Sequence, residues 1–141
     1  MLTGLAHVDI VCRDVERSIA FYLDVLGELG LEPPVSFPGE RGEQIHYLRL
    51  PGGEVGSLGL RSASGPEAEQ TFELYAPGLH HLAFAVAGRG DVDRAHAAAV
   101  RAGAPVLHPP RPFPAYHPDY YATFFLDPDG FRVEVRSRSA S

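Results

Sequence analysis

The stretch Gly4-Leu5-Ala6-His7-Val8-Asp9-Ile10-Val11 opens the chain, and a related stretch, Gly78-Leu79-His80-His81-Leu82-Ala83-Phe84-Ala85, begins 74 residues later. Both place a histidine, His7 or His81, at the same position, and both are followed by an Asp-Val-acid-Arg sequence that predicts the start of a helix. This repeat indicates a duplicated module. If the two halves face each other, the two imidazoles come together, which is how a metal site is assembled from distant residues.

Length and charge narrow the class of protein. The 141 residues, 45% of them hydrophobic, suit a single domain, 1–141, with a sizeable core. A formal net charge of −6 and the lack of any Lys/Arg run argue against nucleic acid and anionic lipid as partners. No basic leader and no apolar run of about 18 residues is present, so we expect a cytoplasmic protein without a membrane span.

The first module, about residues 2–62, is predicted to have the order β-α-β-β-β. Asp14 is a suitable N-cap for its helix, and Gly27 and Gly30 are typical of a helix end. The turn signal Pro51-Gly52-Gly53 separates the last two strands. The predicted elements are strand 5–12, helix 14–26 and extended segments within 31–37, 44–50 and 54–61.

The second module, about residues 79–137, repeats this order after a connector at about 62–78. The sequence Asp127-Pro128-Asp129-Gly130 predicts the turn of its last hairpin. The predicted elements are strand 79–86, helix 91–102, a short strand near 105–107 and the hairpin strands 120–126 and 131–136. Two βαβββ modules of this kind define an α+β fold.

A proline-rich run, residues 108–118, lies between the last predicted elements. Its five prolines exclude a helix and favour a stiff surface loop. The loop carries Phe113, Tyr116 and His117, which either line a substrate-binding cleft or belong to a long connection only.

Strand alternation predicts which residues share a face. His7 and His81 point away from the helices, and Glu134 joins His81 on that face, whereas His80 is expected on the helix face. The first-module counterpart of Glu134 is Gly59, which has no donor. Two histidines and one carboxylate leave open positions on a metal, and this set accepts Fe, Mn, Ni, Co or Zn.

Further candidates surround these ligands. Counting back thirteen positions from Gly59 and Glu134 gives His46 and Tyr121, which we expect to face the cavity as a general base and a hydrogen-bond donor. Arg61 shares a face with the ligand positions, where it either binds a substrate carboxylate or extends into solvent.

Three segments resemble the vicinal oxygen chelate superfamily, which includes glyoxalase I, methylmalonyl-CoA epimerase, extradiol dioxygenases, fosfomycin-resistance enzymes and bleomycin-binding proteins. They are residues 4–22, residues 78–84 and Phe125-Leu126-Asp127-Pro128-Asp129-Gly130-Phe131-Arg132-Val133-Glu134. The resemblance implies a partly open, mixed β-barrel-like sheet with helices outside and a divalent metal bound by His7, His81 and Glu134. It also implies a small oxygen-chelating substrate, beside which we place Phe125, and a homodimer.

The missing donor at Gly59 separates the functional alternatives. Members similar to glyoxalase I usually have Glu or Gln there, so the glycine argues against a lyase or isomerase, while extradiol dioxygenases use a His-His-Glu set. In those dioxygenases a tyrosine stands where this chain has Phe124, and their acid/base histidine has no clear match, for which His117, Tyr116 or Tyr121 would have to substitute. A metal-dependent enzyme of either type is expected, with a metal-free, small-molecule or antibiotic-sequestering protein as the alternative.

Overall fold

A computed structural model describes residues 1–52 and 56–141 of the chain. Gly53 of the predicted turn, and the first two residues of the predicted strand 54–61, lie outside the described residues. The chain divides into two compact units, Met1–Gln70 and Thr71–Ser141, and the boundary between them falls inside the predicted connector.

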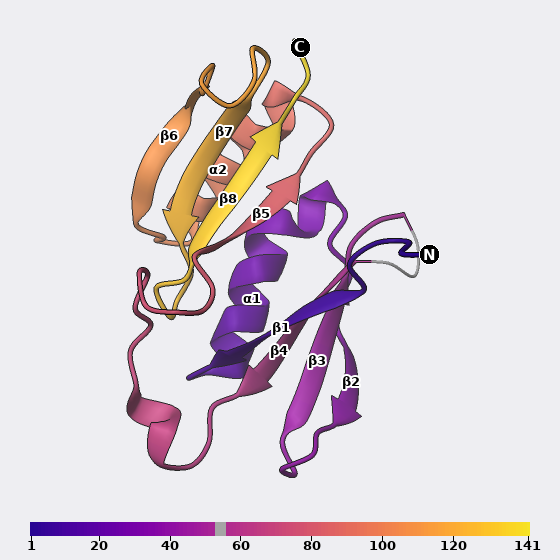
Figure 1. Cartoon of the computed structure of the whole chain (residues 1–141), viewed down its shortest axis with the longest axis vertical. Coiled ribbons are helices and arrows are strands. Elements are labelled where there is room, and N and C mark those ends of the chain that lie inside the picture. Colours follow the sequence, from indigo (N-terminus) through magenta and orange to yellow (C-terminus); the bar gives the residue numbers. More distant parts are fainter. Residues whose placement is uncertain (53–55) are drawn as a thin grey trace. The chain divides into compact units, whose positions relative to one another are not determined.

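The first unit contains a four-stranded mixed sheet with one α-helix against it (Figure 1). The strand order is β1-β4-β3-β2, in which β1 pairs with β4 in parallel and the other pairs are antiparallel. Short 3₁₀ turns lie at Gly27–Leu29 and Pro66–Glu69. The elements are β1 (His7–Cys12), α1 (Val15–Leu26), β2 (Val35–Pro38), β3 (Gln44–Arg49) and β4 (Ser57–Ser62).

The second unit repeats this plan. Its strand order is β5-β8-β7-β6, with β5 and β8 parallel and α2 packed against the sheet (Figure 1). The elements are β5 (His81–Ala85), α2 (Arg89–Arg101), β6 (Val106–Pro112), β7 (Tyr121–Leu126) and β8 (Arg132–Ser137). The predicted α+β fold of two βαβββ modules is confirmed, and the described strands form two four-stranded sheets that are not closed into a barrel.

The helix α1 begins and packs as its sequence dictates. Asp14 has an extended backbone, and its side chain accepts a hydrogen bond from the Arg17 backbone N–H, so it caps the helix. One face of the helix is buried, including Ile19, Tyr22 and Leu26. These positions follow helical spacing, and their burial fixes the helix on the sheet whose strands carry His7.

Replacing Asp14 by alanine is expected to lower the free energy of unfolding by about 1 kcal/mol, because a backbone N–H of the first turn loses its acceptor. Urea denaturation followed by circular dichroism measures the change. Asp24→Ala, an exposed position in the same helix, is the matched control. An equal effect of the two substitutions would show that Asp14 does not act as a cap.

The proline-rich run is only partly a loop. Strand β6 continues through His108 to Pro112, so the expectation of a loop starting at residue 108 is wrong for the first half of the run. Prolines are tolerated there because β6 is an edge strand and its pairing with β7 shifts register on both sides of His108. The connecting loop is therefore limited to residues 113–120.

No helix formed by residues 1–52 and 56–141 is long and apolar enough to span a membrane.

Candidate functional site

Strand register relates the two units residue by residue. In the first unit Asp9 of β1 lies beside Gly59 of β4, and in the second unit Ala83 of β5 lies beside Glu134 of β8. Asp9 follows His7 by two residues, as Ala83 follows His81. Gly59 and Glu134 therefore occupy equivalent positions, as the sequence predicted, and only the second unit has a carboxylate there.

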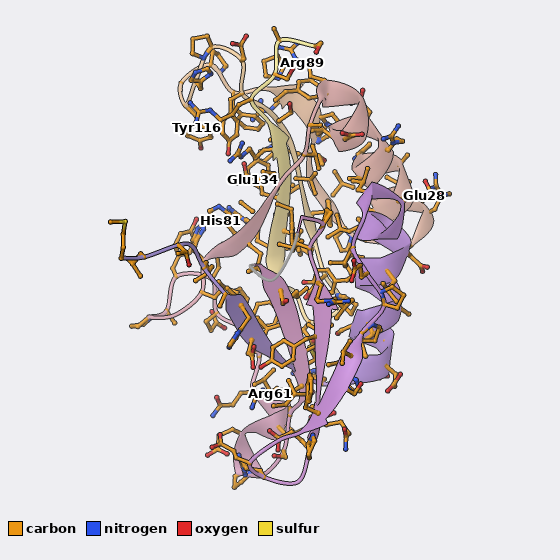
Figure 2. The ribbon with its side chains drawn as sticks, turned by 90° about the vertical axis from the view of Figure 1, so that its right-hand side faces the viewer. Glu28, Arg61, His81, Arg89, Tyr116 and Glu134 are labelled. Atoms are coloured by element: carbon orange, nitrogen blue, oxygen red, sulfur yellow. The ribbon has the colours of Figure 1, made fainter. Side chains whose placement is uncertain are left out.

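His81 and Glu134 come together in the second unit. The two side chains project from the neighbouring strands β5 and β8, and His81 Nε2 lies 3.2 Å from Glu134 Oε2 (Figure 2). The Glu134 residue is only 3% exposed, whereas the His81 side chain is about one-third exposed. A nearly buried carboxylate thus faces an imidazole that solvent reaches.

Tyr120 holds the other oxygen of this carboxylate. Its hydroxyl donates to Glu134 Oε1 at 2.5 Å. Burial, together with the hydrogen bond to Glu134, raises the pKa of Tyr120 to about 12. The phenol is therefore protonated near neutral pH and donates to the carboxylate. The sequence interpretation missed this residue and selected its neighbour Tyr121.

Tyr121 lies on the opposite face of the sheet, so its predicted cavity-facing position is wrong. It pairs with the buried Ser137, its hydroxyl donates to Asp93 of α2 at 2.9 Å, and the Arg89 guanidinium lies over its ring. The error came from counting thirteen positions back from Glu134. Counting from the hairpin turn instead pairs Phe124 with Glu134 and puts Tyr120 on the Glu134 face.

His46 and Phe125 also lie on the helix faces of their sheets, contrary to their predicted roles. His46 is opposite the buried Leu60, and its Nδ1 lies 2.7 Å from the Ser36 hydroxyl. Phe125 is fully buried opposite Val133, where it belongs to the core and is inaccessible to a substrate.

An aromatic cluster, formed by His108, Phe113, Tyr116 and Phe124, extends from the His81–Glu134 pair into the loop after β6. The Phe124 ring centroid lies 6.4 Å from that of His81 and 5.5 Å from that of Phe113. The Phe113 ring stacks on Tyr116 at 5.8 Å, and Tyr116 meets the ring of Tyr120. Phe113 and Tyr116, both predicted to bind substrate, thus belong to one continuous surface of rings that reaches Glu134.

His117 has a local partner in the same loop. Its Nδ1 accepts a hydrogen bond from the Asp119 backbone N–H at 3.1 Å. This bond shapes the turn that leads into Tyr120, and the acid/base role proposed for His117 stays a prediction.

His80 contacts His81 instead of packing under the helix. The two Nδ1 atoms lie 2.8 Å apart, and the His80 ring also meets Tyr75. Strand β5 begins only at His81, so strand alternation does not extend to His80 and the prediction of a helix-face position is wrong. One Nδ1 donates to the other, and the tautomers of the two rings decide which of them is the donor.

The first unit carries a cluster of charges on the face of His7. Arg61 donates to Asp9 Oδ2 through one terminal nitrogen and to Glu43 Oε1, at 3.2 Å, through the other. The hydrogen bond to Asp9 raises the pKa of Arg61. Both terminal nitrogens of Arg61 therefore have carboxylate partners within the unit, which leaves little of its charge for the predicted binding of a substrate carboxylate.

The His81–Glu134 pair has the geometry of two adjacent metal ligands. Metal bonds to imidazole nitrogen and carboxylate oxygen are about 2.1 Å long, so two neighbouring ligand atoms on one ion lie about 3 Å apart. The observed separation is 3.2 Å. Among the described residues no group of three or more His, Cys, Asp or Glu side chains is assembled to hold a metal, and the predicted third ligand, His7, belongs to the first unit.

Comparison with known proteins gives the family. The chain is 34% identical to the uncharacterized protein YwkD of Bacillus subtilis over 96% of this chain and 97% of that protein. It is 29% identical to Glyoxylase I 4 of Arabidopsis thaliana over 95% of this chain and 70% of that protein. A glyoxylase/bleomycin resistance protein/dioxygenase domain from Frankia sp. EAN1pec has a similar structure, with a TM-score of 0.79, 27% identity, and coverage of 97% of this chain and 93% of that one. Residues 4–135 match the profile of the Glyoxalase/Bleomycin resistance protein/Dioxygenase superfamily, and the chain belongs to this superfamily.

Proposed function

We propose that the protein is a divalent-metal-dependent enzyme acting on a small organic substrate that chelates the metal through oxygen. His81 and Glu134 supply two ligands, and His7, at the matching position of the first unit, supplies a third from the same chain or from a second copy. The single observation that carries the proposal is the His81–Glu134 pair, in which a buried carboxylate oxygen faces an imidazole nitrogen at 3.2 Å.

One tautomer of the histidine pair supports a cation at this position. When His81 donates its Nδ1–H to His80, its Nε2 is an acceptor unless the ring is doubly protonated. Glu134 Oε2 is also an acceptor when ionised. Two acceptors at 3.2 Å repel each other unless a proton or a metal ion lies between them. In that tautomer a divalent ion with N and O ligands satisfies both atoms, whereas in the other tautomer His81 Nε2–H donates directly to Glu134 Oε2.

The residues around the pair have separate tasks. Tyr120 donates a hydrogen bond to one oxygen of Glu134 and thereby directs the other oxygen toward His81. A metal-binding carboxylate usually has a hydrogen-bond donor of this kind. His80 orients the His81 ring. A bound divalent cation supplies Lewis acidity toward an oxygen of the substrate. The buried carboxyl group of Glu134 is also placed to accept a proton from the substrate.

The aromatic cluster supports an organic substrate with an apolar or aromatic part. Phe113 is half-buried and Tyr116 is exposed, so their rings offer a surface beside the His81–Glu134 pair. Ring surfaces of this kind bind planar and apolar groups by stacking and by desolvation. Arg111, which lies over the Phe113 ring at 4.6 Å, adds a cation at the rim of this surface.

Metal binding is the test of the proposal. Protein purified without chelators is analysed for metal content, and the metal-depleted protein is titrated with Mn(II), Fe(II), Co(II), Ni(II) and Zn(II) by calorimetry. We expect about one equivalent of metal per site, with one or more of the five ions binding tightly. Failure of all five to bind would overturn the enzymatic proposal and leave the small-molecule or antibiotic-binding protein as the better interpretation.

Two assays separate the reaction classes once a metal is bound. Oxygen consumption with catechols identifies an extradiol-type dioxygenase, and turnover of a hemithioacetal or an epimerisable thioester identifies a lyase or isomerase. Light scattering of the metal-loaded protein tests the expected homodimer in the same samples.

A further inference from the structure

Gly59 has no carboxylate of its own, but the Asp9 carboxylate fills the space that a side chain at position 59 would occupy. A Cβ added to Gly59 would overlap the Asp9 Oδ1 atom and would lie 2.7 Å from Asp9 Cγ and 2.9 Å from Tyr47 Cε1. The carboxylate of Asp9 therefore occupies the volume into which a side chain at position 59 would project. The equivalent residue of the second unit, Ala83, leaves that volume to Glu134.

The surroundings of Asp9 repeat those of Glu134. In each unit a tyrosine hydroxyl donates to one oxygen of the carboxylate: Tyr47 to Asp9 Oδ2 at 3.1 Å, and Tyr120 to Glu134 Oε1 at 2.5 Å. In each unit the other oxygen faces Nε2 of the matching histidine. The Asp9 Oδ1 to His7 Nε2 distance is 3.9 Å, and the Glu134 Oε2 to His81 Nε2 distance is 3.2 Å.

The Asp9 oxygen that faces His7 has no hydrogen-bond partner. Asp9 Oδ1 is buried and lacks a hydrogen bond in the described part of the chain, while Oδ2 receives both Arg61 and Tyr47. Leaving an anionic oxygen buried without a donor is costly. A ligand cation would satisfy it, and a metal-binding carboxylate commonly has its second oxygen anchored by hydrogen bonds as Oδ2 is here.

We propose that Asp9 is a metal ligand, supplying from β1 the carboxylate that position 59 lacks. The proposal rests on the proposed function and adds a fourth protein donor to His7, His81 and Glu134. Residues two apart on a strand are about 6.6 Å apart along the backbone. The His7 and Asp9 side chains nevertheless converge to 3.9 Å, and an approach of about 1 Å brings the two atoms to the spacing of neighbouring ligands on one ion.

A fourth donor changes the reaction class that the site favours. A six-coordinate ion with three protein ligands has three open positions, enough for a chelating substrate and dioxygen together. With Asp9 as fourth ligand a six-coordinate ion would keep two positions, which would suit a substrate that binds through two oxygens. The Asp9 assignment therefore favours the lyase or isomerase class over the dioxygenase class.

Relocating the carboxylate tests the assignment without an activity assay. Mn(II) affinity by calorimetry and the visible absorption of bound Co(II) are compared for wild type, D9A, D9N and the double variant D9A/G59E. We expect D9A and D9N to bind Mn(II) more weakly by about 100-fold or more, because loss of a ligand exceeds the roughly 10-fold to 100-fold cost of losing a ligand's hydrogen-bond partner, and to change the Co(II) spectrum. In D9A/G59E the glutamate introduced at position 59 enters the space vacated by Asp9 once the Tyr47 ring, 2.9 Å from the added Cβ, shifts slightly, so we expect most of the affinity to return.

Glu43→Gln is the matched control, because Glu43 is also an acidic partner of Arg61 but has no contact with His7 among the described residues. We expect E43Q to keep its Mn(II) affinity within about two-fold of wild type. That result would show that the loss in the Asp9 variants does not come from removing a negative charge near Arg61. Thermal unfolding of every variant checks folding, and D9N, which keeps the shape of Asp9, serves if D9A is unstable.

The outcomes separate the two proposals. Wild-type affinity in both D9A and D9N, or an equal loss in E43Q, would overturn the ligand role of Asp9 while leaving the metal site intact. Absence of metal binding by the wild-type protein would overturn the proposed function and this assignment with it.

Discussion

Replacing Glu134 by glutamine is expected to weaken binding of a divalent cation by about 100-fold or more, because loss of a ligand exceeds the 10-fold to 100-fold cost of losing a ligand's hydrogen-bond partner. The glutamine side chain keeps the shape and can still accept from Tyr120, so the substitution removes the charge and little else. Calorimetric titration with the metal that wild type binds measures the loss. Turnover should fall with metal occupancy.

A second test variant and a control make the Glu134 result specific. Tyr120→Phe keeps the ring but removes the donor to Glu134 Oε1, and we expect it to weaken metal binding by about 10-fold to 100-fold. Asp93→Asn removes a carboxylate from α2, on the opposite face of the same sheet, and should leave metal binding unchanged. Wild-type metal affinity in Glu134→Gln would show that Glu134 is not a ligand.

The hydrophobic pattern of the strands and the residues that mark turns and helix ends were enough to predict the fold of each module. The repeated opening sequences and the Asp127–Gly130 turn located the strands, and Asp14 located the start of α1, because these signals act within a few residues. The alternation rule also put His81 and Glu134 on one face correctly. Local rules could not decide whether the two sheets join into a barrel-like sheet, since that depends on contacts distant in sequence.

The errors at the site have a common cause. His46 and Tyr121 were assigned from positions counted along the chain, and Phe125 was assigned with the family resemblance; neither route used hairpin register, which decides the face of a strand and inverts it with a shift of one residue. In β3 Tyr47 opposes Gly59 twelve positions later, while in β7 Phe124 opposes Glu134 after only ten. The loops of the two hairpins differ in length, so one offset cannot serve both.

Hydrogen-bond networks were the other part that sequence could not predict. Tyr120 could have been found from the turn by register, but the contacts of Asp9 with Tyr47 and Arg61 depend on rotamers of long side chains. The sequence showed a missing donor at Gly59. Only the structure shows that a carboxylate from the neighbouring strand fills the same space.

Replacing Phe125 by alanine is expected to lower the free energy of unfolding by about 3–5 kcal/mol, because loss of a fully buried ring opposite Val133 leaves a cavity in the core. This is a large share of the roughly 5–15 kcal/mol by which a domain is stable. Urea denaturation of the metal-free protein measures the loss. The effect separates a core role for Phe125 from the substrate-binding role that its place in the sequence suggested.

Phe113→Ala is the matched substitution, since Phe113 is only half-buried and belongs to the aromatic cluster. We expect it to cost much less stability than Phe125→Ala and, under the proposed function, to raise KM for the substrate, because the truncated ring removes a stacking surface rather than a core side chain. If Phe125→Ala instead left stability unchanged and raised KM, the ring would have to reach the substrate from the face that carries Glu134. The strand pairing excludes that position, because Phe125 lies opposite Val133 and its neighbour Phe124 lies opposite Glu134.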